Sequence, residues 1–415
     1  MIISDRQIYL GYDIGEEFSQ VCYYTMGMKG PCSISTVVGE DRFLIPTCIC
    51  YKNNGLWLYG DEALKCADAG EGTLVNNLIS NSMADEYINI GGESVSYFSC
   101  LVLFLKKTIN LVNLTCGKSD EKRKIVITTR VLNPEMIELL EKLCQVVFNE
   151  KDTVIFHSHK DSLFNYILFQ KKELWINDVV LFDYGQSNFN MYRLKTNRNV
   201  NPNVVYIEET IQENMIGLSP ELRDQAFLNI VNENTMGLTP ISSVYLTGTA
   251  FNDKWLDKSL KVVCRNRRAF IGQNLFAEGA CYKAISSQEE RSDYLYLGEA
   301  RLKVNIGVMA YNRNEEQYIH ILSAGGNWYD TQGQADIILD DSNIVELQIE
   351  SLSGDIKMTK KYELLGLPNR PPKTTRIRIV LKPLSVNKIK ITFEDMGFGE
   401  IFRRSGKIWD FILEY

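Results

Sequence analysis

LGYDIGEEFS at Leu10–Ser19, VVLFDYGQSNFNMYRL at Val179–Leu194 and SVYLTGTAFND at Ser243–Asp253 are three similar stretches that lie far apart in the chain. Each is an apolar, strand-like run that ends in a turn rich in Asp, Gly, Ser, Thr or Asn. Turns of this kind bring backbone amides and small polar groups close to anions such as phosphate. Together the three stretches predict a nucleotide-binding architecture.

The composition of the chain is that of an ordinary globular protein. It has 415 residues, of which 45% are hydrophobic and 23% charged, and this length predicts two or three domains. The net charge of -7 argues against nucleic acid as a partner, because phosphate neutralisation needs a basic surface. No window free of charges reaches membrane-spanning length, and signal-peptide features are absent. We expect a cytoplasmic protein without a membrane span, with the apolar Ser96–Leu105 in a buried helix.

The cysteines and histidines leave a metal site as a minority interpretation. The ten cysteines are scattered and form no CxxC pair, as is typical of a reducing compartment. Cys48 and Cys50 share one face of an expected strand, and His157 and His159 share a face if that segment is extended. Buried thiols acting as small apolar side chains are favoured over a metal or redox site.

Helices and strands are expected to alternate over the first two thirds of the chain, in an α/β layout. The expected strands are Ile8–Asp13, Gln20–Tyr24, Phe43–Tyr51, Leu56–Tyr59, Lys124–Thr129, Thr153–His157, Val179–Tyr184, Asn188–Leu194 and Val244–Thr247. The expected helices are Tyr97–Leu114, Asn133–Gln145, Asp161–Gln170, Pro220–Val231 and Gln273–Ile285. Asn133 followed by Pro134 is a typical helix start.

From about Leu295 the helical periodicity stops, and seven strand-like runs separated by turn residues follow. They are Leu302–Met309, Gln317–Leu322, Ala335–Leu339, Ile344–Glu350, Lys361–Leu365, Thr375–Leu381 and Lys388–Phe393. This pattern predicts a small antiparallel β-sandwich. The polar Ser286–Asp293 is the expected linker, and Ile408–Tyr415 alternates well enough to add a strand or to dock on the body.

The motifs, in this order, resemble those of DnaK-type (seventy-kilodalton heat-shock) chaperones, a family of the actin-like ATPase superfamily. The matching segments are Asp13–Gly15, Pro46, Gly60–Ala63, Ile125–Thr129, Asp183–Phe189, Leu246–Gly248 and Ala277–Ala284, and in the C-terminal part Glu363–Pro372, Ile377–Leu381 and Lys388–Gly399. The resemblance implies an actin-like ATPase fold of two related lobes over residues 1–290, a β-sandwich like the peptide-binding domain over 295–400, and a C-terminal tail over 401–415. Tyr294–Leu297 falls at the family's interdomain linker, and we expect no helical lid after the sandwich.

The resemblance also implies where a nucleotide would bind. The matching positions are Asp13, Gly15, Asp183, Gly185, Gln186, Ser187, Asn188, Thr247, Gly248 and Thr249. ATP or ADP is the implied ligand, with Mg²⁺ held through water by Asp13 and Asp183, and Asp183 is the implied catalytic residue if the protein is active.

Several positions depart from the family's pattern. Glu16 and Glu17 stand where the family has threonines, and a carboxylate about 4 Å from a phosphate oxygen costs about 4 kcal/mol at an effective dielectric constant of about 20. Asn190 replaces the last acid of the second loop. The family's catalytic lysine falls near Leu78 and its glutamate near Ser158; His157, His159 or Asp161 as a substitute base is disfavoured.

The stretch between Asn190 and Val244 is short enough to allow only one helix and two strands, so the subdomain that clamps adenosine in the family is missing. We therefore expect a degenerate chaperone-like protein that binds a protein or peptide through its C-terminal sandwich, with little or no ATP hydrolysis. An ATP-binding chaperone-like or actin-like protein with slow turnover is the alternative. A sugar or acetate kinase of the same superfamily is a distant third, because those enzymes have no use for the sandwich.

Overall fold

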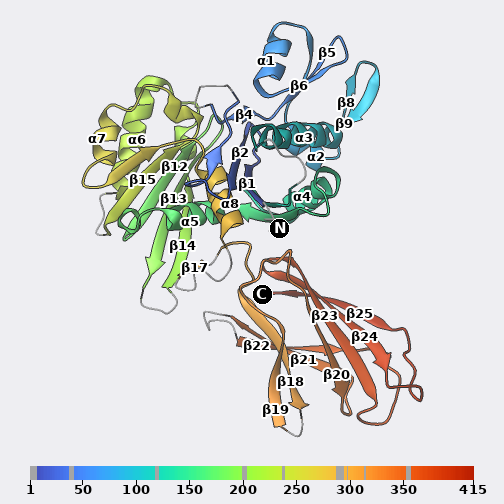
Figure 1. Cartoon of the computed structure of the whole chain (residues 1–415). Helices are drawn as coiled ribbons and strands as arrows, with labels where there is room; N and C mark the ends of the chain where they lie inside the picture. Colours follow the sequence, from blue (N-terminus) through green and yellow to red (C-terminus); the bar gives the residue numbers. More distant parts are fainter. Residues whose placement is uncertain are drawn as a thin grey trace, which may run out of the picture. The chain divides into compact units, whose positions relative to one another are not determined.

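The computed structural model describes residues 7–36, 42–116, 121–198, 203–235, 239–286, 294–296, 298–312, 315–351 and 357–415. The chain divides into two compact units, Met1–Tyr296 and Leu297–Tyr415. The first is mixed α/β, and the second contains only strands and loops among its described residues (Figure 1). The linker expected at Ser286–Asp293 lies mostly outside the described residues.

Two sheets with the same strand order form the centre of the first unit. The first has the order β11-β10-β1-β2-β3, with β4 also paired to β2, and the second has the order β16-β15-β12-β13-β14-β17. The strands of the first sheet are β1 (Ile8–Asp13), β2 (Phe18–Thr25), β3 (Cys32–Ser33), β4 (Ile45–Pro46), β10 (Arg123–Thr129) and β11 (Thr153–Ser158). Those of the second are β12 (Asp178–Tyr184), β13 (Phe189–Asn197), β14 (Asn203–Ile211), β15 (Ile241–Thr247), β16 (Arg268–Ile271) and β17 (Tyr294–Tyr296).

The two sheets are alike in strand direction and in register. In each, a hairpin (β1–β2 or β12–β13) is flanked by two parallel strands on the side of its first strand and by an antiparallel strand on the other. Asp13 lies opposite Gln20 and Thr128, and Asp183 lies opposite Asn190 and Thr247. The two aspartates therefore occupy equivalent places, each at the end of a buried strand.

Two helices pack between the sheets (Figure 1), α5 (His159–Phe169) and α8 (Leu275–Ile285). α5 begins with a complete capping box, in which Ser158 and Asp161 bond each other's backbone amides. The helices touch at Gly279, where an added Cβ would lie 2.0 Å from the carbonyl oxygen of Ser162. Glycine is required there because any side chain would push the helices apart.

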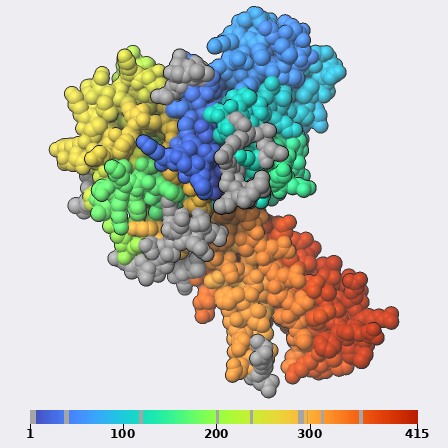
Figure 2. Space-filling model, viewed as in Figure 1, coloured from blue at the N-terminus to red at the C-terminus, as the bar shows by residue number. Residues whose placement is uncertain are grey.

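The remaining elements cover the outer sides of the two sheets. We call each sheet, together with the elements that cover it, a lobe of the first unit. Around the first sheet lie α1 (Gly60–Asp68), α2 (Leu78–Met83), α3 (Tyr97–Cys116), α4 (Pro134–Val147), the small sheet of β5 (Ile49–Lys52), β6 (Trp57–Tyr59) and β7 (Gly72–Val75), and the hairpin of β8 (Tyr87–Ile90) and β9 (Glu93–Ser96). Beside the second lie α6 (Pro220–Thr235), α7 (Lys258–Val263) and the short 3-10 turns Lys172–Leu174, Glu213–Met215 and Thr249–Asn252. In Figure 2, α6 and α7 form the yellow surface of the second lobe.

Helix α3 has the length and apolar composition that a membrane-crossing helix needs. In the structure, however, it packs against β2, α2 and α4. Tyr12 of β1 and Thr108 of α3 are both buried, and their hydroxyls are 2.8 Å apart. The helix thus contributes one face to the core of the first lobe, as expected for Ser96–Leu105.

The second unit consists of two four-stranded antiparallel sheets, with the orders β19-β18-β21-β22 and β20-β23-β24-β25. The strands are β18 (Val304–Asn312), β19 (Glu315–Leu322), β20 (Gly333–Leu339), β21 (Ile344–Ser351), β22 (Lys357–Glu363), β23 (Thr375–Ser385), β24 (Lys388–Gly397) and β25 (Ile408–Glu414). The sheets pack face to face, since the Tyr362 ring of one lies 5.6 Å from the Phe393 ring and 5.0 Å from the Phe411 ring of the other.

Most expected helices and strands are confirmed, and some of their bounds are corrected. The strand expected at Phe43–Tyr51 is two strands, because Thr47 and Cys48 interrupt the pairing. The helix expected from Asp161 begins two residues earlier, at the Ser158 cap. Within the expected tail 401–415, the added strand expected at Ile408–Tyr415 is confirmed: Ile408–Glu414 pairs with β24 along its whole length, because its inward-facing Trp409, Phe411 and Leu413 continue the core face.

Candidate functional site

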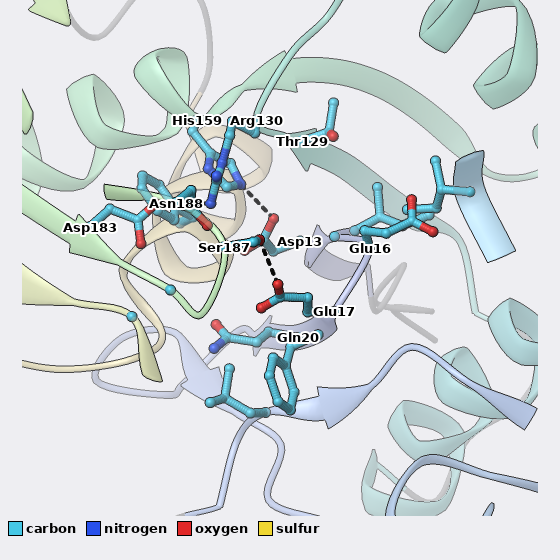
Figure 3. A pocket seen from close by; sticks show the side chains of 18 of the residues that line it. Asp13, Glu16, Glu17, Gln20, Thr129, Arg130, His159, Asp183, Ser187 and Asn188 are labelled. Atoms are coloured by element: carbon cyan, nitrogen blue, oxygen red, sulfur yellow. Dashed lines mark hydrogen bonds and ion pairs between the residues drawn. The ribbon is translucent and has the colours of Figure 1, made fainter. Parts of the chain in front are cut away.

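A pocket of about 530 Å³ lies in the first unit where the ends of β1, β10, β12 and β15 meet. Its walls come from both lobes (Figure 3). The lining residues include Asp13, Gly15, Asp183, Gly185, Ser187, Asn188, Thr247, Gly248 and Thr249. These are all of the positions expected to bind nucleotide except Gln186, which is exposed on the turn and does not line the pocket.

Asp13 is held by a histidine from α5. Its Oδ1 lies 2.8 Å from Nε2 of His159, and the His159 ring stacks on Phe276 at a centroid distance of 3.8 Å. His159 was considered with His157 as part of an extended strand; it is instead the first residue of a helix. The capping box orients this helix start, so the ring points into the pocket at Asp13.

Asp183 is held by an arginine that follows β10. Its Oδ2 accepts a hydrogen bond from Nη2 of Arg130 at 3.2 Å. Burial raises the pKa of the Asp183 carboxyl above its ordinary value, and the charge of Arg130 offsets part of that shift. The two equivalent aspartates therefore each face a basic side chain of the protein itself.

The two turns expected to cradle phosphates are joined directly to each other. Ser187 Oγ donates a 2.6 Å hydrogen bond to Oε1 of Glu17, so the β12–β13 turn and the β1–β2 turn touch across the pocket (Figure 3). Glu16 points away from this contact and accepts hydrogen bonds from the backbone and hydroxyl of Ser80, at 3.1 and 2.9 Å. Glu16 thus binds the first turn of helix α2, whereas Glu17 links the two lobes.

The third turn is filled by a glutamine side chain. Gln273 accepts from the backbone amide of Gly248 at 3.1 Å and donates to the carbonyl of the same residue at 2.9 Å. Gly248 has a φ of +98°, and an added Cβ would lie 2.3 Å from the carbonyl oxygen of Tyr184. The tight turn of the expected motif is therefore present, but its backbone groups are already bonded within the protein.

Asn190 stands where the chaperone family that the sequence resembles has its last loop acid, and a nearby glutamate changes the effect of that replacement. Its amide donates to Oε1 of Glu209 at 2.7 Å, and Glu209 pairs with the buried Lys160 at 2.7 Å. The loop motif gives no sign of Glu209, because this residue lies on β14, outside every motif. Glu209, the acid that remains beside this loop, is therefore already paired with Lys160.

The charge of the pocket does not fit a polyphosphate. Its lining contains four carboxylates, Asp13, Glu16, Glu17 and Asp183, and one guanidinium, that of Arg130. The described residues contain no group of three or more His, Cys, Asp or Glu side chains able to hold a metal ion. Asp13 and Asp183, the expected water-mediated Mg²⁺ ligands, are aimed at His159 and Arg130 instead. A triphosphate would enter against this net negative charge.

Sequence reasoning missed the residues that partner the expected ones. Arg130 and Gln273 lie outside the phosphate and adenosine motifs, and His159 is considered from the sequence as a disfavoured substitute base. A signal for Arg130 did exist, because it directly follows the strand Ile125–Thr129 that ends beside β1. Residues after the ends of neighbouring parallel strands meet at one edge of a sheet, so this position was a candidate from its place alone.

Two family profiles together match almost the whole chain. One, described as "Family of unknown function (DUF5716) C-terminal", matches residues 30–299, and the other, described as "Domain of unknown function (DUF8552)", matches residues 301–415. Their boundary lies close to that between the two compact units. No curated protein matches the chain. The first profile covers well over half of the chain but starts after Asp13, Glu16 and Glu17. The chain therefore belongs to the DUF5716 family.

Proposed function

We propose that this chain is a degenerate relative of the actin-like ATPases that binds a protein or peptide through its second unit and does not hydrolyse ATP. The duplicated strand order of the two sheets supports an actin-like architecture with two related lobes. The two packed antiparallel sheets of the second unit support a likeness to a chaperone peptide-binding domain. The proposal includes a cytoplasmic location, which the scattered cysteines suggest, and no nucleic-acid partner, which the net charge of -7 suggests.

The main support for the proposed loss of hydrolysis is one contact. The Glu17–Ser187 hydrogen bond joins the two turns between which phosphates would have to lie. Asp13 and Asp183, which would order Mg²⁺-bound water, are held by His159 and Arg130. Both aspartates thus already have hydrogen-bonding partners within the protein. A nucleotide would have to break these contacts before it could bind.

We expect the protein to show no binding of Mg²⁺·ATP tighter than about 1 mM and no phosphate release. Replacing Glu17 with threonine should raise affinity for ADP at least about tenfold, or ~1.4 kcal/mol, because the change removes a carboxylate and opens the contact between the turns. Isothermal titration calorimetry and a phosphate-release assay measure both.

Glu16→Thr is the matched control, since it removes the same charge from the same turn but at a side chain bonded to Ser80. It should change ADP affinity much less than Glu17→Thr does. Micromolar ATP binding with phosphate release by the unaltered protein would overturn the proposed loss of hydrolysis. Equal gains from the two variants would show that total charge, and not the contact between the turns, limits binding.

The β18–β19 hairpin is the best-supported peptide-binding surface of the second unit. Beyond Gly307, the described residues of β18 pair only with β19. Met309 and Tyr311 lie on one face of this extension with 41% and 78% of their surface exposed. Trp328, by contrast, is buried and is not available on this surface. Exposed apolar side chains on a strand suit an extended peptide.

Full-length protein should bind a fluorescein-labelled heptapeptide with three central leucines in a saturable manner, measured by anisotropy. The double change Met309→Ser and Tyr311→Ser should weaken binding about tenfold, or ~1.4 kcal/mol. Ile412→Ser, which removes a comparably exposed apolar side chain from β25, is the control and should have little effect. Equal weakening by both variants, or no binding at all, would contradict this assignment.

A slow ATP-binding protein remains the second candidate because one observation favours it. All of the expected contact residues except Gln186 converge on one pocket, whose volume lies in the range of small-molecule sites. The calorimetric titration above separates the two candidates.

A further inference from the structure

A second hollow in the first unit, of about 520 Å³, is lined by parts of α2, the β8–β9 hairpin, the start of α3 and one face of α4. Of the residues that line this hollow, only Met83 also lines the first pocket. In Figure 2 the surfaces of the β8–β9 hairpin and of α4 lie on the same flank of the unit. We call this hollow the α4 groove.

The α4 groove exposes apolar side chains that the fold does not cover. Met83, Tyr87 and Val146 are 40%, 67% and 48% exposed, and they come from α2, β8 and α4. Scattered exposed apolar residues are ordinary, but three around one hollow are typical of a contact surface. The groove therefore offers an incoming segment apolar contacts from three different elements.

The rim of the α4 groove is strongly acidic. Asp85, Glu86, Glu135 and Glu138 line it together with one base, Lys142. Lys142 is already 2.8 Å from Glu138, and no other base lies within ion-pair distance of Asp85, Glu86 or Glu135 in the parts of the chain that the structure describes. Asp85 lies within the electrostatic influence of Lys142, but none of these three carboxylates forms an ion pair among the described residues. An occupant with basic side chains would therefore meet three carboxylates that attract it and help to orient it.

The α4 side of the groove favours a helix over an extended strand as the occupant. On α4, the groove is lined by Glu135, Glu138, Leu139, Lys142, Gln145 and Val146, which recur every three or four residues along one helix face. This stripe is about 16 Å long at 1.5 Å per residue. A second helix of roughly eleven residues would pack along it.

We propose that the α4 groove binds an amphipathic helix of a protein partner, with apolar residues on one face and lysine or arginine on its borders. The apolar face would contact Met83, Tyr87 and Val146, and the basic residues would pair with Asp85, Glu86 and Glu135. This surface is separate from the peptide-binding hairpin of the second unit, so either proposal can fail without the other.

The test uses the full-length protein and three fluorescein-labelled helical peptides of equal length. One combines a leucine face with lysine borders, one has glutamate in place of lysine, and one is a scrambled form of the first. The lysine peptide should bind with a Kd below about 100 μM, at least tenfold tighter than the other two. Its affinity should fall as salt is raised from 50 to 300 mM, on the order of fivefold, because surface ion pairs are screened.

Variants locate the site on the protein. Glu135→Lys and Tyr87→Ser should each weaken the lysine peptide about tenfold. The matched control is Glu141→Lys, which makes the same charge change on an exposed residue of the same helix outside the groove; it should weaken binding less than about twofold. Thermal melts should show that all three variants are folded.

Three outcomes would overturn the proposal. Equal binding of the lysine and scrambled peptides would indicate unspecific attraction to an acidic protein. Equal effects of Glu135→Lys and Glu141→Lys would place the contact outside the groove. Sedimentation showing a dimer that Tyr87→Ser dissociates would make a second copy of this chain the occupant.

Discussion

Replacing Asp395 with asparagine is expected to lower the free energy of unfolding of the second unit by about 3–5 kcal/mol. The Asp395 side chain is fully buried and forms two hydrogen bonds with Arg370, both 2.7 Å long. It also accepts from the backbone amides of Gly397 and Ser405, which ties the segment before β25 to the sheet. The change leaves the buried guanidinium of Arg370 without its counter-ion, and an unpaired buried charge is costly.

The same carboxylate makes the stability of the second unit depend on pH. Burial alone would raise the pKa of Asp395, but the hydrogen bonds from Arg370 and from the amides of Ser405 and Gly397 outweigh it and hold the pKa well below the ordinary value. A carboxyl whose pKa is lower in the folded state contributes its full stabilisation above the unfolded pKa, about 3.9. We expect this contribution to be lost as the pH falls below about 4, and to be absent from the asparagine variant.

Asp336→Asn is the matched control. Asp336 also forms a two-bond contact with an arginine, Arg378, on the same sheet, but this pair is about one third exposed. An exposed pair is worth at most about 1 kcal/mol, so this variant should melt close to the unaltered protein. Calorimetry of the full chain, with hydrogen exchange of residues 357–415, measures both. Similar losses from the two variants would contradict the role assigned to burial.

Gly279→Ala is the second change with a large expected effect, a loss of about 3 kcal/mol in the stability of the first unit. In an ordinary helix this substitution would stabilise by about 1 kcal/mol. Here the new methyl would lie 2.0 Å from the carbonyl oxygen of Ser162, so α5 and α8 would have to separate. Because α5 begins at His159, the same shift would disturb the contact with Asp13.

Gly272→Ala serves as the control for Gly279→Ala, because its added Cβ would meet nothing closer than Asn274 Oδ1 at 3.7 Å. Urea unfolding of both variants, followed by circular dichroism, should show a lower midpoint only for Gly279→Ala. A stabilised Gly279→Ala protein would mean that the two helices do not pack as closely as the structure shows.

The local signals that predicted helices and strands were reliable where one segment decided its own structure. Asn133 and Pro134 start α4 as expected, because capping and the fixed φ of proline act within one turn. The strand at Phe43–Tyr51 was predicted too long, since Thr47 bonds to the backbone of Glu17 on another hairpin. A contact of that kind has no signal inside the segment itself.

By itself, the sequence determined which strands end in turns containing Asp, Gly and Thr. From this it predicted that Asp13, Asp183 and Gly248 would approach one another. Only the tertiary structure decided what these residues touch. His159 reaches Asp13 across 146 positions and Ser187 reaches Glu17 across 170. Periodicity and turn propensity act over a few residues, whereas these contacts depend on how two sheets and the helices between them pack.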